Sequence, residues 1–144
     1  MDLKLMLDAG EVEQLIMRGF EASTPFFHID ALEPGRAKVH MPFKSWMRRP
    51  GNVISGPALF TAADLAMYAL VLSHLGPVMM AVTSNLNLNF LNKGEAGDVH
   101  AEAEMLKLGR KLAVMDIKLR CADKPVLVAH ATGTYSIPSA RPAA

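Results

Sequence analysis

A long apolar stretch in the middle of the chain carries both the start and the stop signals of a helix. Ser55 occupies an N-cap position, Pro57 falls in the first turn, and Gly76-Pro77 closes the far end. These signals predict a helix from Pro57 to Leu75. It is apolar on nearly all sides, which favours a position inside the protein, with a sheet wrapped around the helix.

A membrane span is disfavoured for the same stretch. Its most apolar part, Pro57 to Leu72, is shorter than the ~20 residues that a span needs. It also carries Asp64 at its middle, where a bilayer would oppose a charge by ~2.5–3.5 kcal/mol. We therefore expect the buried helix of a soluble protein and no membrane partner.

Segments with the period of strands lie on both sides of this helix. Pro34-Gly35 separates two of them and suits a hairpin turn, because glycine adopts positive φ readily. Another segment places Leu86, Leu88 and Phe90 on one face and asparagines on the other. The predicted strands cover residues 26–33, 36–42, 79–91, 98–107, 110–121 and 126–137. The order predicts an α+β fold, a curved antiparallel sheet of about six strands around one long central helix.

The other segments predict smaller features. Asp8 and Glu11 resemble a capping box, so a short surface helix is expected over residues 8–20. Lys44 to Asn52 is expected to be an irregular loop, and Ile137 to Ala144 a frayed tail. We find no linker and no internal repeat, so residues 1–144 are expected to form a single domain.

Composition excludes several classes of function. The 15 Lys and Arg against 14 Asp and Glu leave a net charge of +1, which disfavours nucleic acid as a partner. Cys121 is the single cysteine, so a reducing, cytoplasmic location is expected. The five histidines lack metal-ligand spacing, and no phosphate-binding glycine loop occurs.

Asp64 is the strongest chemical anomaly, because it lies among alanines and leucines. With Pro57, Thr61 and Tyr68 it forms the single polar stripe on the helix. One interpretation is a structural Asp tied to a hydroxyl or an amide; the other is a general base that lines a cleft. The spacing favours neither interpretation.

The helix start is a second candidate. The backbone N–H groups of Ser55 and Gly56 lie at the positive end of the helix dipole, where they could stabilise a carbonyl oxygen that gains negative charge. Every capped helix offers such groups. The position of Asp64 about two turns further along gives the signal its weight.

With these residues in hand, the chain resembles a hotdog-fold acyl-CoA thioesterase of the phenylacetate-pathway type, from roughly Phe43 to Tyr135. The resemblance rests on three segments, which are Ser55-Gly56-Pro57-Ala58-Leu59-Phe60-Thr61-Ala62-Ala63-Asp64, Ala81 to Leu91, and Lys107-Leu108-Gly109-Arg110-Lys111-Leu112-Ala113. The family opens its helix with His-Gly-Gly and has an acid nine positions after the histidine. Here Gly56 and Asp64 match, whereas Ser55 replaces the histidine, Pro57 replaces the second glycine, and Arg49 stands where the family has asparagine.

The resemblance implies hydrolysis of an acyl- or aryl-acyl-CoA without a metal or organic cofactor, with coenzyme A as part of the substrate. It implies Asp64 as general base or nucleophile, Gly56 as donor to the thioester oxygen beside Ser55, and Thr83 as the hydroxyl that orients water. In the family, Gly56 and Thr83 would meet Asp64 across a dimer interface. We therefore expect a homo-oligomer that is at least a dimer, and we favour a tetramer.

Substrate-binding residues follow from the same resemblance. Arg110 and Lys111 are candidates for the phosphates of coenzyme A, and Met67 and Tyr68 for the acyl group. Asn52 and Thr61 complete the candidate substrate-binding set.

Two other functions stay open. The first is a non-catalytic protein that binds acyl-CoA or another hydrophobic ligand with the same fold. The second is a hotdog dehydratase, which needs a His–acid pair and ranks last because Ser55 stands at the helix start.

Overall fold

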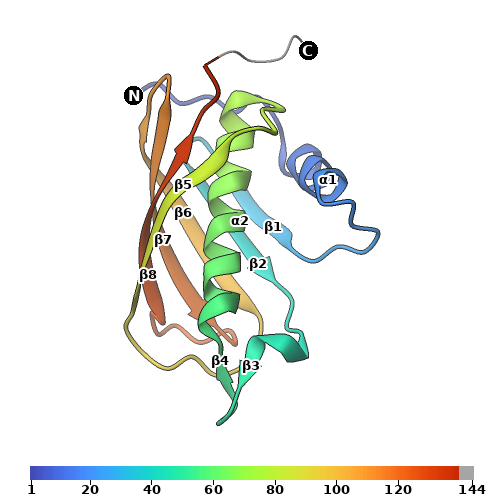
Figure 1. The fold of residues 1–144 in the computed structure, drawn as a ribbon, viewed down its shortest axis with the longest axis vertical. Coiled ribbons are helices and arrows are strands. Elements are labelled where there is room, and N and C mark those ends of the chain that lie inside the picture. The colour runs from blue at the N-terminus through green and yellow to red at the C-terminus, as the bar shows by residue number, and fades with distance from the viewer. Residues whose placement is uncertain (140–144) are drawn as a thin grey trace.

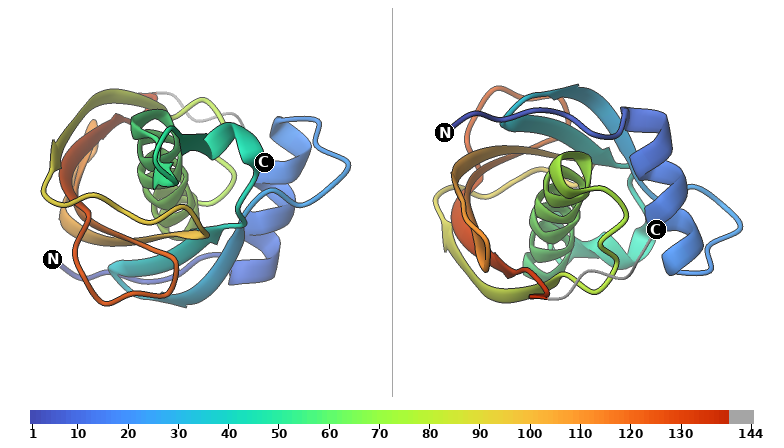
Figure 2. Two further views of the ribbon diagram at one scale, coloured as in Figure 1. Left: turned by 90° about the horizontal axis from the view of Figure 1, so that it is seen from below. Right: turned by 90° about the horizontal axis from the view of Figure 1, so that it is seen from above.

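The central helix has the position that the sequence predicts. The computed structural model describes residues 1–139, and in it α2 (Gly56–Leu75) runs through the middle of a curved sheet (Figures 1 and 2). The Ser55 hydroxyl caps the helix by accepting the Ala58 N–H at 3.3 Å, and Gly76 ends it at φ 82°. α2 has 20 residues, so its length alone would allow a membrane span, contrary to the length argument made above. Its burial by the sheet identifies it as a core helix.

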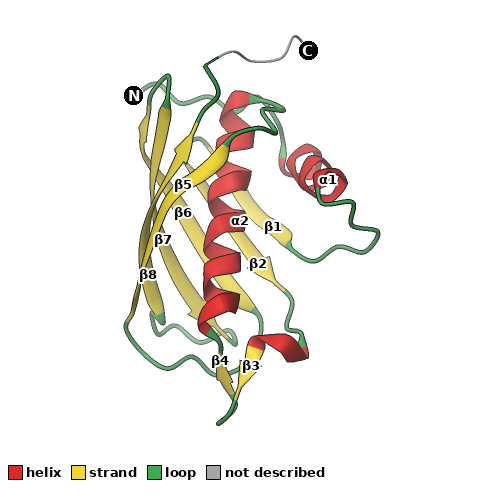
Figure 3. Ribbon diagram, viewed as in Figure 1, coloured by secondary structure: helices red, strands yellow, loops and turns green. Residues whose placement is uncertain are grey.

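One antiparallel sheet surrounds this helix, as the colouring by secondary structure shows (Figure 3). The strand order is β1-β2-β6-β7-β8-β5, and every neighbouring pair is antiparallel. The strands are β1 (His28–Glu33), β2 (Arg36–Met41), β5 (Val82–Phe90), β6 (Val99–Leu108), β7 (Leu112–Cys121) and β8 (Ala129–Ser136). The α+β hotdog architecture is confirmed, with six strands. Gly35 turns the β1–β2 hairpin at φ 81°.

Small residues let the sheet approach α2 closely. Along β8 the inward positions alternate as Ala129, Ala131, Gly133 and Tyr135, all of them buried. A Cβ on Gly133 would collide with Met67 of α2, whose Cε would lie at 2.8 Å. Met67 is fully buried there, which gives it a packing role against β8, and its predicted contact with the acyl group stays a prediction. Its side chain fills the space above a glycine in the core.

Two segments lie at the periphery of the sheet, one predicted to be a helix and the other an irregular loop. α1 (Ala9–Gly19) has the predicted capping box of Asp8 and Glu11 and packs against α2 and β1. The expected irregular loop instead contains a 3-10 turn (Ser45–Met47) followed by β3 (Arg48–Arg49), which pairs with β4 (Val53–Ile54). Two short strands with a tight turn between them are below the length at which a strand period is visible in sequence.

The start of the expected frayed tail is ordered. Ile137 is buried, and its N–H donates to Lys111 O at 2.8 Å, so the chain stays attached to the sheet beyond β8. The prediction of fraying from Ile137 is therefore wrong for Ile137 itself, because its apolar side chain still reaches the core. Residues 140–144 lie outside the described part of the chain.

β5 is an edge strand with unusual exposure. It pairs with β8 alone, whereas the opposite edge of the sheet is β1. Leu86 and Leu88 are half-buried against the core, as predicted. In contrast, Phe90 is 58% exposed and Val82 is 56% exposed. An edge with free backbone groups and exposed apolar side chains is suited to pairing with another chain.

Candidate active site

Asp64 lies at the meeting point of three elements. On α2 it is half-buried, and its Oδ1 accepts hydrogen bonds from Thr83 Oγ1 of β5 at 2.6 Å and from Tyr135 Oη of β8 at 2.8 Å. Within residues 1–139, no side chain donates a hydrogen bond to Oδ2. One oxygen of the carboxylate is thus anchored and the other is available to a ligand. The hydroxyl tie of the structural interpretation is therefore present, and the free Oδ2 leaves the functional interpretation open.

A β-bulge in β5 brings Thr83 to Asp64. Strict alternation would place Thr83 on the face of Asn85 and Asn87, away from the helix. The register shifts between Thr83 and Asn85, so that Thr83 faces Tyr135 while Leu86 faces Gly133 on the same inner side. Thr83 therefore meets Asp64 within one chain, and the expectation that these two groups meet across a dimer interface is wrong for Thr83.

Tyr135 is held as a hydrogen-bond donor. Burial raises the pKa of its phenol strongly, and the negative charge of Asp64 raises it further. The hydroxyl consequently stays protonated far above neutral pH and points at the carboxylate. Tyr68 stacks against it with ring centroids 5.9 Å apart, and burial raises the pKa of Tyr68 as well. The Tyr68 hydroxyl donates to Met79 O at 3.2 Å.

Two cavities meet at Asp64. The larger, of about 530 Å³, extends over Tyr68, Met79 and Val82 and has Tyr135 in its wall. The smaller, of about 320 Å³, is lined by the apolar side chains Phe20, Phe26, Phe60, Leu65 and Leu86, together with Thr61 and Thr83. Both cavities share Phe20, Asp64, Leu65 and Thr83. The predicted site residues Thr61, Tyr68 and Thr83 are thus gathered around Asp64.

The helix start lines a separate cavity of about 560 Å³. Gly56 lies there with Arg49, Lys93 and Phe90, and a Cβ on Gly56 would come within 3.5 Å of the Phe90 ring. Gly56 precedes Asp64 by eight residues of helix, about 12 Å along the axis at 1.5 Å per residue. One chain therefore does not bring Ser55 and Gly56 to the Asp64 carboxylate.

The remaining predicted residues lie at two ends of the fold. Asn52, at φ 57°, is exposed in the turn between β3 and β4, near the helix start. Arg110 and Lys111 are exposed in the β6–β7 turn. This turn lies at the end of the sheet where β5 begins, because Leu112 pairs with Ser136 and Ser136 with Val82. The basic turn and the larger cavity thus share one end of the molecule.

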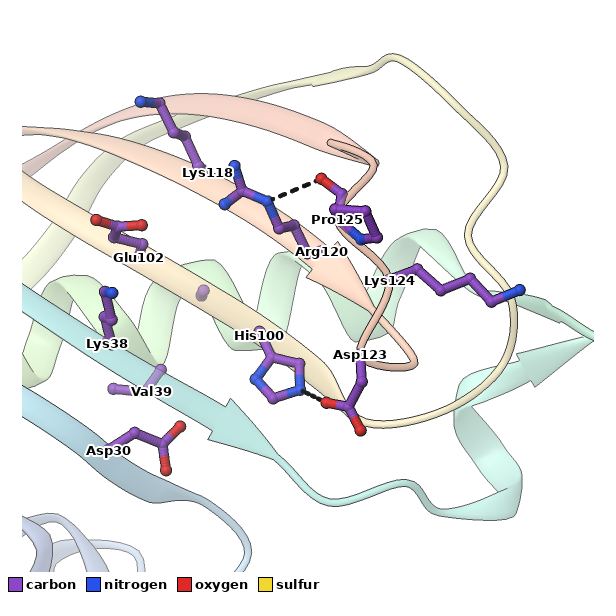
Figure 4. Close-up of a pocket in the computed structure, with 11 residues that line it drawn as sticks. Asp30, Lys38, Val39, His100, Glu102, Lys118, Arg120, Asp123, Lys124 and Pro125 are labelled. Carbon is purple, nitrogen blue, oxygen red and sulfur yellow. Dashed lines mark hydrogen bonds and ion pairs between the residues drawn. The ribbon is translucent and has the colours of Figure 1, made fainter.

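The outer face of the sheet carries another groove, of about 380 Å³ (Figure 4). Its three carboxylates each face a basic group. His100 lies 3.0 Å from Asp123, His40 2.8 Å from Asp30, and Arg36 3.5 Å from Glu102. In the described part of the chain, no group of three or more His, Cys, Asp or Glu side chains is placed to hold a metal ion. Asp64 is therefore the stronger candidate for chemistry.

Sequence reasoning missed two residues of this site. Tyr135 is the one large side chain among the small inward residues of β8, and that break in the pattern is a usable signal. Phe20, at the C-cap of α1, gives no such signal, because only the packing of α1 against α2 brings it to Asp64.

Comparisons with known proteins agree with this fold. Residues 51–128 match the family model described as the thioesterase superfamily. A protein of Saccharolobus solfataricus, named a putative esterase, is 33% identical over 106 residues, which is 74% of each chain. The crystal structure of a putative thioesterase from Silicibacter superposes with a TM-score of 0.85 at 40% identity, covering 94% of this chain and 95% of that one. A mutant of the phenylacetic acid degradation protein PaaI from Thermus thermophilus has a TM-score of 0.66 at 26% identity, covering 78% and 93%.

Proposed function

This chain belongs to the thioesterase superfamily, and from that premise we propose that it hydrolyses the thioester of an acyl- or aryl-acyl-CoA at Asp64. The observation that carries the proposal is the state of the carboxylate. Asp64 is anchored through Oδ1 by Thr83 and Tyr135, and it opens onto two cavities. A carboxylate that is both oriented and accessible suits a general base or a nucleophile.

The reaction uses the free oxygen of Asp64. As a general base, Oδ2 takes a proton from a water molecule while the water oxygen attacks the thioester carbonyl carbon. The C–S bond then breaks, the thiolate of coenzyme A takes up a proton, and the acyl group leaves as a carboxylic acid. As a nucleophile, Oδ2 attacks the same carbon, the C–S bond breaks, and the coenzyme A thiolate leaves and takes up a proton from solvent. Water then hydrolyses the resulting mixed anhydride to the carboxylic acid and regenerates the Asp64 carboxylate. In both routes Thr83 and Tyr135 hold the carboxylate in place, and neither route needs a metal or an organic cofactor.

A second copy of the chain supplies the oxyanion donor. The backbone N–H of Gly56 lies about 12 Å along the helix from Asp64, too far to serve the same thioester oxygen within one chain. The exposed edge of β5 offers a surface on which two chains can pair. We propose a homo-oligomer, at least a dimer and by extension a tetramer, in which Gly56 of one chain faces Asp64 of the other.

The carrier of the substrate enters from the basic end of the sheet. Arg110 and Lys111 lie at the end where β5 begins, and the larger cavity reaches Val82 at that end. Their charges suit the phosphates of coenzyme A. Tyr68 lines the larger cavity together with Asp64. A phenylacetate-pathway type of substrate and a cytoplasmic location accompany this proposal.

Release of free thiol from a panel of acyl-CoAs tests the proposal. Short, medium, long and aromatic acyl-CoAs are incubated with the protein, and a thiol reagent reports coenzyme A. We expect turnover of at least one member of the panel. Tight binding of acyl-CoA without thiol release would instead favour the non-catalytic binding protein. Formation of a double bond in a hydroxyacyl-CoA would favour the dehydratase.

A further inference from the structure

We propose that Phe20 determines which acyl group this enzyme accepts, by separating the two cavities at Asp64 and closing the smaller one as an apolar acyl subsite. The inference rests on the proposed thioesterase function and deepens it. Phe20 is 61% exposed, although it is a large aromatic residue, and it lines both cavities together with Asp64. Of the four residues that line both cavities, Phe20 has the largest side chain, so we assign the partition between them to Phe20.

The backbone around Phe20 holds the ring at this place. Phe20 is the C-cap of α1, and its N–H donates to Ile16 O at 3.0 Å. The next residue, Glu21, has φ 52°, which turns the chain back so that the Ala22 N–H donates to Met17 O at 2.9 Å. A residue other than glycine in the left-handed region needs support from its surroundings, and these two hydrogen bonds provide it.

Aromatic contacts connect Phe20 to the core. Its ring meets the edge of Phe26 at 5.8 Å between centroids, and Phe26 contacts Phe27 at 5.2 Å. Phe27 is 1% exposed. The Phe20–Phe26 pair is edge-to-face and the Phe26–Phe27 pair is tilted, and both are arrangements that aromatic rings favour. The exposed ring of Phe20 is thus fixed by its neighbours instead of swinging freely in solvent.

The two cavities differ in chemistry, and this difference indicates which cavity takes the acyl group of the thioester and which takes the coenzyme A portion. The smaller is walled by Phe20, Phe26, Phe60 and two leucines, and no basic residue lines it. The larger has the hydroxyl of Tyr68 and the carbonyl of Met79 in its wall, and it leads toward the basic β6–β7 turn. The amide-containing arm of the carrier therefore lies in the larger cavity and the acyl group in the smaller one. An uncharged, apolar acyl group fits there, whereas a second carboxylate would be buried without a partner beside Asp64.

Phe20 also lies outside the segment that the family model matches, residues 51–128. Asp64 and Thr83 lie within that segment. The catalytic carboxylate and the wall that selects the acyl group thus come from different parts of the chain. A substitution at Phe20 can change the preference for acyl groups while the catalytic groups stay in place.

The test compares acyl-chain profiles of four proteins. kcat/KM is measured for acetyl-, butyryl-, hexanoyl-, decanoyl-, phenylacetyl- and succinyl-CoA with the wild type, Phe20→Ala, Phe20→Trp and Trp46→Ala. Trp46 is the matched control, since it is 56% exposed in the 3-10 turn and lines neither cavity. Phe20→Leu is added in case the alanine variant unfolds.

We expect Phe20→Ala to raise the decanoyl to butyryl ratio of kcat/KM by about 10-fold or more, because single methylenes in apolar pockets change this ratio by 10–200-fold. Phe20→Trp shifts the ratio in the opposite direction, Trp46→Ala leaves it unchanged, and succinyl-CoA is a poor substrate for the wild type. A folded Phe20→Ala with the wild-type profile, or a wild type that prefers succinyl-CoA, overturns the inference and leaves the thioesterase function standing. A wild type without any turnover overturns the proposed function, and the inference with it.

Discussion

The two oxygens of Asp64 have different environments, and this difference separates orientation from reactivity. Oδ1 receives both hydroxyl hydrogen bonds, at 2.6 and 2.8 Å. Oδ2 receives no side-chain hydrogen bond among residues 1–139, so this side of the carboxylate stays open to a ligand. Its partners, Thr83 and Tyr135, come from strands 19 and 71 residues away along the sequence.

Replacement of the carboxylate tests its role directly. We expect Asp64→Asn to keep the fold and to lower kcat by about 10²–10⁴-fold, since the amide preserves volume and loses the base. The matched control is Asp116→Asn, because Asp116 is likewise hydrogen-bonded, to His130, but on the outer face of the sheet. Thiol release at saturating acyl-CoA gives the comparison. Activity of Asp64→Asn within a few-fold of the wild type would show that Asp64 is structural.

In the proposed mechanism Tyr135 acts through Asp64, as a positioning residue. We expect Tyr135→Phe to lower kcat by about 10–100-fold, because a hydrogen bond to a charged group is worth about 1.5–3 kcal/mol. The phenyl ring keeps the stacking against Tyr68. In the Asp64→Asn background the same substitution should cost almost nothing more, and that non-additivity is the decisive readout. Equal losses in both backgrounds would assign Tyr135 a role independent of Asp64.

Cys121 is the single thiol, and burial raises its pKa to about 11. We therefore expect the native protein to react with a thiol reagent far more slowly than the unfolded protein, which keeps the thiol-release assay free of background. The thiol has a pKa near 9 in the unfolded chain and about 11 in the folded protein. The folded state therefore holds this proton more tightly, and the stability that this provides is fully present below pH 9 and is lost as the pH rises from 9 to 11. Labelling with and without denaturant, and denaturant midpoints between pH 7 and 11, measure the two effects. Stoichiometric labelling of native protein within seconds at pH 7 would contradict this account.

At the scale of elements, the contact between α2 and β8 decides how tightly the sheet closes. Gly133 is the point of closest approach, beneath the buried side chain of Met67. The bulge in β5 beside it decides which residues of that strand face inward. These two irregularities, a glycine and an extra residue, let a regular sheet present Thr83 and Tyr135 to one carboxylate.

We expect Gly133→Ala to lower the free energy of unfolding by about 1–3 kcal/mol, because the added methyl group overpacks against Met67. Met67→Ala in the same chain creates room, so the double variant should be more stable than the sum of the two losses predicts. The control is Gly109→Ala in the β6–β7 turn, where the nearest atom to a Cβ lies at 3.5 Å. Urea denaturation of the wild type and the four variants measures these free energies. Additive losses at Gly133 and Met67 would mean that the two positions do not compete for space.

At the scale of the whole molecule, the site that we propose is divided between two chains. Each chain contributes one carboxylate and one helix start, about 12 Å apart along its own α2. The exposed apolar residues of β5 and the free edge of that strand lie beside these groups. Two-fold pairing would then create two equivalent sites from residues that cannot meet within one chain.

Mixing two inactive variants tests this arrangement. Asp64→Asn and Gly56→Val should each be inactive, the second because a β-branched side chain blocks approach to the N–H. After denaturation and refolding together, mixed dimers contain one intact site, so about a quarter of the wild-type activity should return. Light scattering of the wild type should give a dimer or a larger oligomer. Absence of recovery from a mixture that does contain mixed dimers would place the complete site within one chain.

The sequence by itself determined the features that depend on neighbours a few positions away. The caps at Ser55 and Gly76, the capping box at Asp8, the turn at Gly35 and the strand periods are local, because each depends on hydrogen bonds or side-chain directions within one element. Asp64 could be singled out for the same reason, as the one acid on an apolar helix. The enclosure of α2 by the sheet could also be predicted, because a helix that is apolar on nearly all sides has no polar face to expose to water.

Only the tertiary structure decided which distant residues meet. The bulge that turns Thr83 inward, the pairing of Tyr135 with Asp64 and the placement of Phe20 depend on strand register and on the packing of α1 against α2. Strict alternation would have sent Thr83 outward. Register and packing are set by long-range contacts, and one extra residue in a strand reverses the side chains that follow it. The hydrophobic period of a single segment does not contain this register, because the free energy that selects it comes from packing between elements that are distant in the sequence.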